Sequence, residues 1–418
     1  MSEGFQLPEM RRIDSRKSPL EMAEGLQHLE DFIWLDSAGN LRPGDDSTLS
    51  LITARAERRL IGSLADTSSL ERAMNKWSVA DETSELDFPR GGLFGTIDYE
   101  GAFSFGVYPE LLVYHHATDT WYEQGSLSQA WKESGFRESA KIEQPQAEQS
   151  QESYEASVRK IHDYIAAGDL YQVNLCQRFS SQVSEQGNLF DLYKCLRKST
   201  PAPMAAYLRQ GDREVLSSSP ETFLRFTGRE VFTRPIKGTR PRFSDPLLDQ
   251  QAAYELRTSE KEIAELVMIT DLLRNDLGKV CEFGSVEVTE MLKLESYEQV
   301  YHLVSTVKGV LKHEVGQIEA LSACSPGGSI TGAPKIRSMQ VIDELESSPR
   351  GLYTGSIGYF GFNGISQFNI VIRTLIREAN LLHYHVGAGI VADSEPTAEF
   401  HETLHKAKGL RQALEQFA

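Results

Sequence analysis

Two pairs of glutamates have a spacing that brings carboxylates together on one face of a helix. Glu262 and Glu265 lie three residues apart, and Glu399 and Glu402 repeat that spacing near the C-terminus, with Lys406 one turn further on. Residues three or four apart on a helix are neighbours, although solvated helix faces often carry such pairs. Oxygen ligands without a cysteine or histidine cluster suit Mg²⁺, which binds one or two carboxylates together with substrate oxygens. The two pairs therefore predict a magnesium site on which an anionic substrate can bind.

A second candidate metal site is the segment HETLH at residues 401–405. It has the HExxH spacing with which zinc proteases place two histidines one helical turn apart, with a glutamate that acts as base. The longer version of that motif needs glycine at position 408 and histidine at position 411, where this sequence has Lys408 and Arg411. The zinc interpretation is therefore disfavoured.

A glycine-rich segment, GGSITGAPK, occupies residues 327–335. A nucleotide-binding loop of the Walker type needs Gly-Lys-Ser/Thr, whereas Lys335 follows Pro334 and precedes Ile336. Two interpretations stay open for this segment. It is either a plain tight turn, or a turn into a helix whose free backbone N–H groups hold an anion.

The glutamate pairs require two long helices to carry them. Residues 259–277 have apolar side chains at helical spacing with charges opposite, and a final helix is expected to begin near Ser394-Glu395-Pro396 and to run to the C-terminus. Strands are expected at 171–183, 354–362, 367–376 and 381–391. Because strands and helices come in blocks, we expect an α+β fold: large antiparallel sheets in a sandwich-like core with helices packed outside.

Residues 143–155, EQPQAEQSQESYE, are polar and glutamine-rich, and predict a linker. They separate a β-rich N-terminal region, residues 1–142, from a larger C-terminal domain, residues 156–418, which contains the candidate chemistry. The N-terminal region is expected to act as a supporting layer.

Composition and net charge exclude several classes of protein. The chain has 418 residues, 40% of them hydrophobic and 25% charged, which provides a large core and excludes global disorder. A net charge of −17 argues against nucleic acid as a partner. No apolar stretch is long enough to span a membrane, and the N-terminus lacks the apolar segment of a secretory signal, so we expect a cytoplasmic protein without a membrane partner. Four cysteines without CxxC spacing are expected to be reduced.

Segments spread over residues 168–407 together resemble the chorismate-utilising enzymes, the family of anthranilate synthase component I and aminodeoxychorismate synthase component I. The matching segments follow one another in the expected order: GDLYQVNLCQRF (168–179), SSSPETF (217–223), TRPIKGTRPR (233–242), AELVMITDLLRNDLGKV (264–280), YHLVSTV (301–307), SPGGSITGAPKIRSMQVIDELE (325–346), GSIGYFGF (355–362), IRTL (372–375) and GAGIVADSEPTAEFHETLHKA (387–407). The resemblance implies the anthranilate synthase component I-like fold, with the catalytic domain in the C-terminal part.

The same resemblance implies a set of site residues. Glu265 and Glu402 would be the Mg²⁺ ligands, with Glu262 and Glu399 in support. The groups implied to contact or line the substrate are Arg373 and Tyr359, at the enolpyruvyl carboxylate, and Thr239, Gly387, Ala388, Gly389 and Lys406, partly around the ring carboxylate. His302 stands where the family has an active-site histidine.

Lys237, in PIKGT, stands where anthranilate synthases have alanine, and resembles the aminodeoxychorismate type. Its implied role is to attack ring carbon 2 as the carbon-4 hydroxyl leaves, before ammonia attacks carbon 4 and expels the lysine. An ordinary lysine has a pKa of ~10.4, so the neutral amine costs about 4–5 kcal/mol near pH 7. Burial or a neighbouring cation would reduce that cost. Without the motif, a salt-bridging lysine on a strand end would be the simpler interpretation.

Glu221, in SPE, is implied to be the general acid that protonates the leaving hydroxyl, a role worth about 10²–10⁴ in rate. The alternative is a carboxylate at a helix N-terminus after Pro220. Gln172 stands where isochorismate and salicylate synthases have a water-activating lysine, and glutamine cannot serve as that base.

No cysteine lies in a recognisable glutaminase motif. The resemblance therefore implies a separate glutamine amidotransferase subunit that supplies ammonia. Anthranilate synthase component I, and a chorismate or tryptophan sensor without catalysis, stay open as alternatives. For the tryptophan-binding elements of the family, Pro203-Met204-Ala205 resembles one piece.

Overall fold

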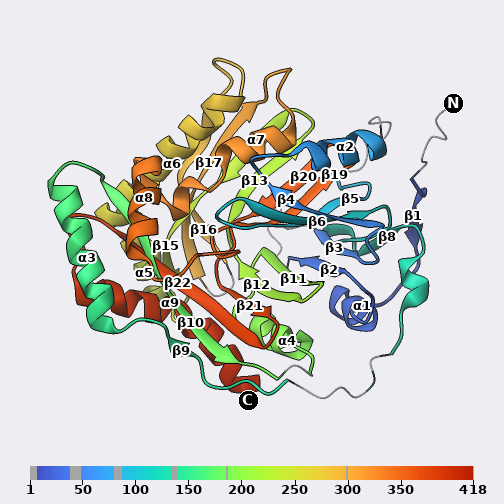
Figure 1. Cartoon of the computed structure of the whole chain (residues 1–418), viewed down its shortest axis with the longest axis horizontal. Helices are drawn as coiled ribbons and strands as arrows, with labels where there is room; N and C mark the ends of the chain where they lie inside the picture. Colours follow the sequence, from blue (N-terminus) through green and yellow to red (C-terminus); the bar gives the residue numbers. More distant parts are fainter. Residues whose placement is uncertain are drawn as a thin grey trace.

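The computed structural model describes residues 7–37, 49–79, 87–133, 135, 140–184, 187–297 and 300–417. In these residues two large antiparallel sheets pack together and helices cover them from outside (Figure 1). The α+β class and the sandwich-like core predicted from the sequence are confirmed.

The first sheet contains twelve strands within the described ranges. In spatial order they are β1 (Met10–Ile13), β8 (Thr120–Gln124), β7 (Leu111–His115), β3 (Leu49–Thr53), β2 (Phe32–Asp36), β11 (Met204–Gln210), β12 (Arg213–Ser219), β21 (Thr374–Glu378), β22 (Leu381–Ile390), β10 (Gln172–Gln182) and β18 (Gly332–Ala333), with β9 (Gln146–Ala147) paired to β10.

The second sheet contains ten strands, counted over the same residues. Their order is β15 (Ile236–Pro241), β17 (Val300–Val310), β14 (Glu230–Arg234), β13 (Thr222–Thr227), β20 (Ile365–Asn369), β19 (Ser356–Gly361), β5 (Gly92–Ile97), β6 (Ala102–Tyr108) and β4 (Arg58–Ser63), with β16 (Glu287–Ser296) paired to β17.

Both sheets combine strands from the two sides of residues 143–155. In the first sheet β2 pairs with β11, and in the second β5 pairs with β19. The segment predicted to be a linker contains β9 and the beginning of helix α3, so the sheets do not separate there. A hydrophobic cluster that joins Ile33, Phe94 and Ile357 fills the space between the two sheets.

The chain crosses between the sheets twice close to the candidate site. It leaves β12 and enters β13 through Pro220 and Glu221, and it leaves β20 and enters β21 through residues 370–373. The sequence predicted one continuous strand over 367–376, and that prediction is wrong. The strand breaks because the chain changes sheets, and Arg373 at the crossing has a φ of 52°.

Helices surround the sheets. They are α1 (Pro19–Leu26), α2 (Ser68–Trp77), α3 (Gln151–Ala166), α4 (Phe190–Ser199), α5 (Pro246–Thr258), α6 (Glu260–Val280), α7 (Gln317–Cys324), α8 (Lys335–Leu345) and α9 (Pro396–Phe417), with short 3₁₀ turns η1 (His116–Thr118), η2 (Leu127–Ala130) and η3 (Gly328–Ile330). In Figure 1, α3, α6, α8 and α9 gather on the left, opposite β1 and α1.

Helices α6 and α9 confirm the two long helices expected for the glutamate pairs. The Ser259 side chain accepts from the N–H of Glu262 and so caps α6. The buried stripe of α9 is Glu399, Thr403, Ala407, Leu410, Ala413 and Leu414, a helical spacing that faces the core. No described helix is long and apolar enough to cross a membrane. All four cysteines are free thiols.

Candidate active site

Two neighbouring cavities lie between strand β15 and helices α6 and α9. The Glu221 cavity, about 180 Å³, takes its name from a buried carboxyl in its lining, and the Glu265 cavity, about 760 Å³, contains the carboxylates of both helices. The residues that line both cavities are Lys237, Gly238, Thr239, Arg373 and Lys406. The two spaces therefore meet at the tip of β15.

The Glu265 cavity brings together three of the four glutamates predicted from spacing. Glu262 and Glu265 extend from α6, and Glu402 extends from α9. Cations are interleaved with them: Lys237 Nζ lies 3.8 Å from Glu265 Oε2, and Lys406 Nζ lies 2.8 Å from Glu402 Oε1. The charges of Lys406, Lys261 and Lys237 outweigh burial and lower the pKa of Glu402, so this carboxylate is ionised at neutral pH.

Glu399 lies deeper, on the buried stripe of α9. Its Oε1 accepts a hydrogen bond from Ser394 Oγ at 2.7 Å and lies 3.5 Å from Lys261 Nζ. Its Oε2 is buried and has no hydrogen-bond partner in the described part of the chain. A buried carboxylate oxygen without a partner is costly, and a cation or a water would satisfy it.

This donor set fits Mg²⁺. In the described ranges no three His, Cys, Asp or Glu side chains form a tight metal-binding group. Mg²⁺ does not require one, because it keeps several waters and takes one or two carboxylates plus substrate oxygens. Glu265 and Glu402 would hold it, with Glu262 and Glu399 beside them. His401 and His405 are both exposed on α9, and His405 lies in the lining of the Glu265 cavity.

Lys237 is the second residue of β15 and reaches into both cavities. Its side chain is 17% exposed. The next residue, Gly238, has a φ of 67°, and a Cβ there would lie 2.5 Å from a methyl of Leu256. Only glycine tolerates both this positive φ and this close contact. The backbone turn at Gly238 in turn sets the direction of the Lys237 side chain.

Glu221 lies in the loop between β12 and β13, so the alternative interpretation at a helix N-terminus is wrong. It is 6% exposed. Burial raises the pKa of its carboxyl to about 7, and the Ser329 hydroxyl, Lys237 and Arg373 oppose that rise without cancelling it. A carboxyl that titrates near neutral pH beside a lysine is suited to donate a proton.

Arg373 faces Glu221 from the second crossing between the sheets. Within the described residues its guanidinium forms no ion pair or hydrogen bond, although it lines both cavities. Burial lowers the pKa of Arg373 and the Glu221 charge acts in the opposite direction. A half-buried guanidinium with free donors is the group in this cavity best suited to bind a substrate carboxylate.

His302 lies on β17, opposite Thr239 on β15. Its Nδ1 lies 3.1 Å from Thr239 Oγ1 and 3.3 Å from the Gly238 carbonyl oxygen, and it lines the Glu221 cavity. The ring is 3% exposed. The structure therefore places the predicted histidine beside β15, the strand that carries Lys237.

The three consecutive residues 387–389 of strand β22 face different surroundings. Gly387 lines the Glu221 cavity and Gly389 lines the Glu265 cavity, whereas Ala388 packs its methyl in the hydrophobic core. Lys406 Nζ donates to the Gly387 carbonyl at 3.0 Å. Ala388 therefore lines neither cavity.

The structure does not bring Tyr359 to the other predicted residues. Its ring stacks on Phe94, and it lines a different cavity of about 40 Å³ together with Pro203, Met204 and Ala205. The tyrosine that lines the Glu221 cavity is Tyr353, in the turn before β19. Periodicity does not mark an irregular turn, so the sequence reasoning missed it.

The glycine-rich segment 327–335 supplies Ser329, which lines the Glu221 cavity and hydrogen-bonds to Glu221. This residue was also missed from the sequence. Lys335 begins α8 and is not available to a phosphate, because its Nζ donates to Asp276 Oδ2 at 3.0 Å and to the Cys324 carbonyl at 2.7 Å. Gln172 is buried on β10, outside the lining of both cavities.

Comparison with known proteins agrees with this geometry. The family model described as chorismate binding enzyme matches residues 33–412. Anthranilate synthase component 1 of Thermus thermophilus is 46% identical over 270 residues, 65% of this chain and 58% of the relative. Aminodeoxychorismate synthase component 1 of Bacillus subtilis is 45% identical over 266 residues, 64% and 56% respectively. The chain thus spans a little more than half the length of these relatives.

Solved structures share the fold. Anthranilate synthase component I from Streptococcus pneumoniae superposes with a TM-score of 0.76 at 28% identity, over 89% of this chain and 94% of that one. The menaquinone-specific isochorismate synthase MenF from Escherichia coli gives a TM-score of 0.77 at 19% identity, over 97% and 95%.

Proposed function

The chain belongs to the family of chorismate binding enzymes, and we propose that it converts chorismate and ammonia to 4-amino-4-deoxychorismate, for p-aminobenzoate and folate synthesis. One observation carries the proposal: Lys237 reaches both the carboxylates of the Glu265 cavity and the buried acid of the Glu221 cavity. An amine in that place can attack a ring that the surrounding cations hold.

The proposed reaction has two displacements at one ring. The neutral Lys237 amine forms a bond to carbon 2 while the ring double bond shifts and the carbon-4 hydroxyl departs. Ammonia then bonds to carbon 4, the double bond shifts back, and the Lys237 nitrogen leaves carbon 2. The sum is chorismate plus ammonia giving the amino product plus water, with the lysine regenerated.

Glu221 supplies the proton that makes the hydroxyl leave as water. Its raised pKa, about 7, keeps a large share of the carboxyl protonated at neutral pH. The Ser329 hydroxyl hydrogen-bonds to this carboxyl in the lining of the cavity, and the charge of Arg373 acts on it without a direct bond. The Lys237 nitrogen becomes positively charged when it bonds to carbon 2, and the Glu221 carboxylate, which has just given its proton to the leaving water, takes up the proton that this nitrogen releases. In the second displacement Glu221 returns that proton to the departing Lys237 nitrogen and takes one from the ammonia that has bonded to carbon 4.

The charged groups of the two cavities indicate a different binding place for each of the two carboxylates of chorismate. Arg373 is the proposed partner of the enolpyruvyl carboxylate, together with Tyr353, because both line the Glu221 cavity. The ring carboxylate would lie toward Glu265, Glu402 and Lys406. Mg²⁺, when bound there, supplies the positive charge that lets an anion approach these glutamates.

Anthranilate synthase is the second candidate, since relatives of both names match at 46% and 45% identity. That reaction adds nitrogen at carbon 2 and eliminates pyruvate. The presence of a lysine amine, rather than an inert side chain, at the tip of β15 favours the first candidate. We also propose a separate glutamine amidotransferase subunit as the source of ammonia, which the designation component 1 of the relatives supports.

The test is mass spectrometry of the intact protein with chorismate and Mg²⁺ but without ammonia. We expect a covalent adduct on the wild type, its absence in Lys237→Ala, and its persistence in Lys261→Ala, which removes another lysine of the Glu265 cavity. With ammonium added, the product should be 4-amino-4-deoxychorismate. Fluorescent anthranilate as the sole product would refute the proposal.

A further inference from the structure

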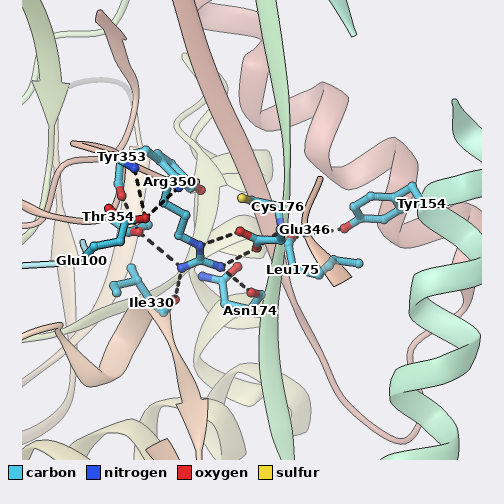
Figure 2. Close-up of polar contacts among 11 residues, drawn as sticks. Glu100, Tyr154, Asn174, Leu175, Cys176, Ile330, Glu346, Arg350, Tyr353 and Thr354 are labelled. Atoms are coloured by element: carbon cyan, nitrogen blue, oxygen red, sulfur yellow. Dashed lines mark hydrogen bonds and ion pairs between the residues drawn. The ribbon is translucent and has the colours of Figure 1, made fainter. Parts of the chain in front are cut away.

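Arg350 is a buried arginine behind the Glu221 cavity whose five N–H groups are all used. It is 2% exposed. Nε donates to Glu346 Oε2 at 2.9 Å and Nη2 to Glu346 Oε1 at 2.7 Å. Nη1 donates to the Ile330 carbonyl at 2.9 Å and to Thr354 Oγ1 at 3.3 Å, and Nη2 to the Asn174 carbonyl at 2.7 Å (Figure 2). A guanidinium has five donors, so this one is saturated.

Apart from Glu346, the acceptors come from three different segments of the chain. Asn174 belongs to β10, Ile330 to the glycine-rich turn, and Thr354 to the turn before β19. Asn174 and Ile330 line the Glu221 cavity themselves, and the neighbours Ser329 and Tyr353 line it too. One side chain thus fastens three parts of the cavity lining to each other.

The buried charge is fully compensated. Glu346 pairs with both ends of the guanidinium fork, and its Oε1 also accepts the N–H of Cys176 on β10 at 3.0 Å. The guanidinium carbon lies 4.7 Å from the centre of the Tyr99 ring, and the backbone N–H of Arg350 donates to Glu100 Oε1 at 3.0 Å. A satisfied network of this kind is rigid, whereas one with a missing partner leaves a buried group unpaired.

We propose that Arg350 is the positioning residue of the active site: through its fork it fixes Asn174, the Ser329–Ile330 turn and Tyr353 around the bound substrate. It does not touch the cavity itself. The inference rests on the proposed function only in taking the Glu221 cavity as the place where chorismate binds.

A lysine in this position could not replace the arginine. Lysine keeps the charge that pairs with Glu346, but it has three donors on one nitrogen and no planar fork. It cannot reach both carboxylate oxygens and the carbonyls of Asn174 and Ile330 at once. Arg350→Lys therefore separates the charge, which is kept, from the positioning, which is lost.

The test compares Arg350→Lys with Arg377→Lys by steady-state kinetics of chorismate consumption and by thermal unfolding. Arg377 is a suitable control, since it also pairs with a buried carboxylate, Glu214, and donates to the carbonyls of Ser184 and Gly187, yet lines neither cavity. We expect comparable losses of thermal stability, but about a tenfold or greater rise in KM only for Arg350→Lys. The falling limb of its pH profile should also move to higher pH, because a displaced Ser329 no longer lowers the pKa of Glu221.

Thr354→Ala is a milder second variant, which removes one acceptor and tests the inference if Arg350→Lys does not fold. We expect a severalfold rise in KM and unchanged folding. The inference would be overturned if the folded variant had a KM within twofold of the wild-type value and an unchanged pH profile. It would also be overturned if Arg377→Lys changed KM by the same factor. Consumption of chorismate is measured whatever product forms, so a failure of the proposed amination reaction is seen separately, in the product.

Discussion

Replacement of Glu221 by glutamine should cost activity and at the same time stabilise the protein at alkaline pH. The carboxyl is buried, and burial raises its pKa from the ordinary 4.5 to about 7. Glutamine has nearly the same shape and can still accept the Ser329 hydrogen bond, but it carries no titratable proton. The substitution thus removes the acid and the buried charge together.

The magnitude follows from the shift in pKa. A rise from 4.5 to about 7 corresponds to about 3 kcal/mol between the two protonation states. Since the folded pKa is raised, the protonated group's contribution to stability is fully present below pH 4.5 and is lost as the pH rises through 7. Relative to the wild type, Glu221→Gln should therefore gain up to about 3 kcal/mol between pH 5 and pH 8. Its turnover should fall by about 10²–10⁴.

Urea unfolding of both proteins at pH 5 and pH 8 checks the stability, and kcat/KM against pH checks the acid. In the wild type kcat/KM should fall above pH 7, because it reports the free enzyme's essential acid. A stability difference between variant and wild type that stays constant across this range would refute the assignment of the raised pKa to Glu221. So would a Glu221→Gln enzyme with wild-type turnover.

Three further predictions address other parts of the site. Glu265→Gln should raise the Mg²⁺ concentration for half-maximal activity by about tenfold or more, whereas Glu260→Gln, exposed on the same helix, should not; a magnesium titration of activity measures both. Arg373→Lys should raise KM for chorismate about tenfold and leave the unfolding temperature nearly unchanged, since this guanidinium lacks partners among the described residues. Asp276→Asn should destabilise the fold by about 3 kcal/mol in urea unfolding, because it leaves the ammonium of Lys335 nearly buried and unpaired.

Much of the scaffold could be predicted from the sequence. The spacing of Glu262 and Glu265 on an amphipathic pattern predicted α6, and the Ser-Glu-Pro start predicted α9, because helix periodicity and capping are local properties. The prediction that these two helices bring their carboxylates to one site rested on the matching spacing of the two glutamate pairs and on the family resemblance. Periodicity says which face of a helix is polar, but not which other helix it meets.

The features that the sequence did not predict lie in turns and crossings, where the chain leaves regular secondary structure. The run 367–376, QFNIVIRTLI, has the mixed composition of a partly buried strand, and nothing in its pattern marks the point at which it passes from one sheet to the other. Ser329 and Tyr353 lie in turns, where side-chain direction depends on tertiary contacts. The assignment of Tyr359 to the site stays unsupported by the geometry, because β19 presents that ring to Phe94.

The two crossings explain why the acid and the cation of the site face each other. The Ile370 N–H donates to the Glu221 carbonyl at 3.1 Å, and the Ser218 N–H donates to the Arg373 carbonyl at 3.1 Å, so the crossings are bonded to each other. Each carries an energetic cost: a carboxyl buried at Glu221, and a positive φ at Arg373, which costs about 1–2 kcal/mol outside glycine. Two such violations of local preference at one point are expected where function, rather than stability, determines the residue. The extensive sheets on either side maintain this geometry, and a change that loosens the crossings should impair the acid before it unfolds the protein.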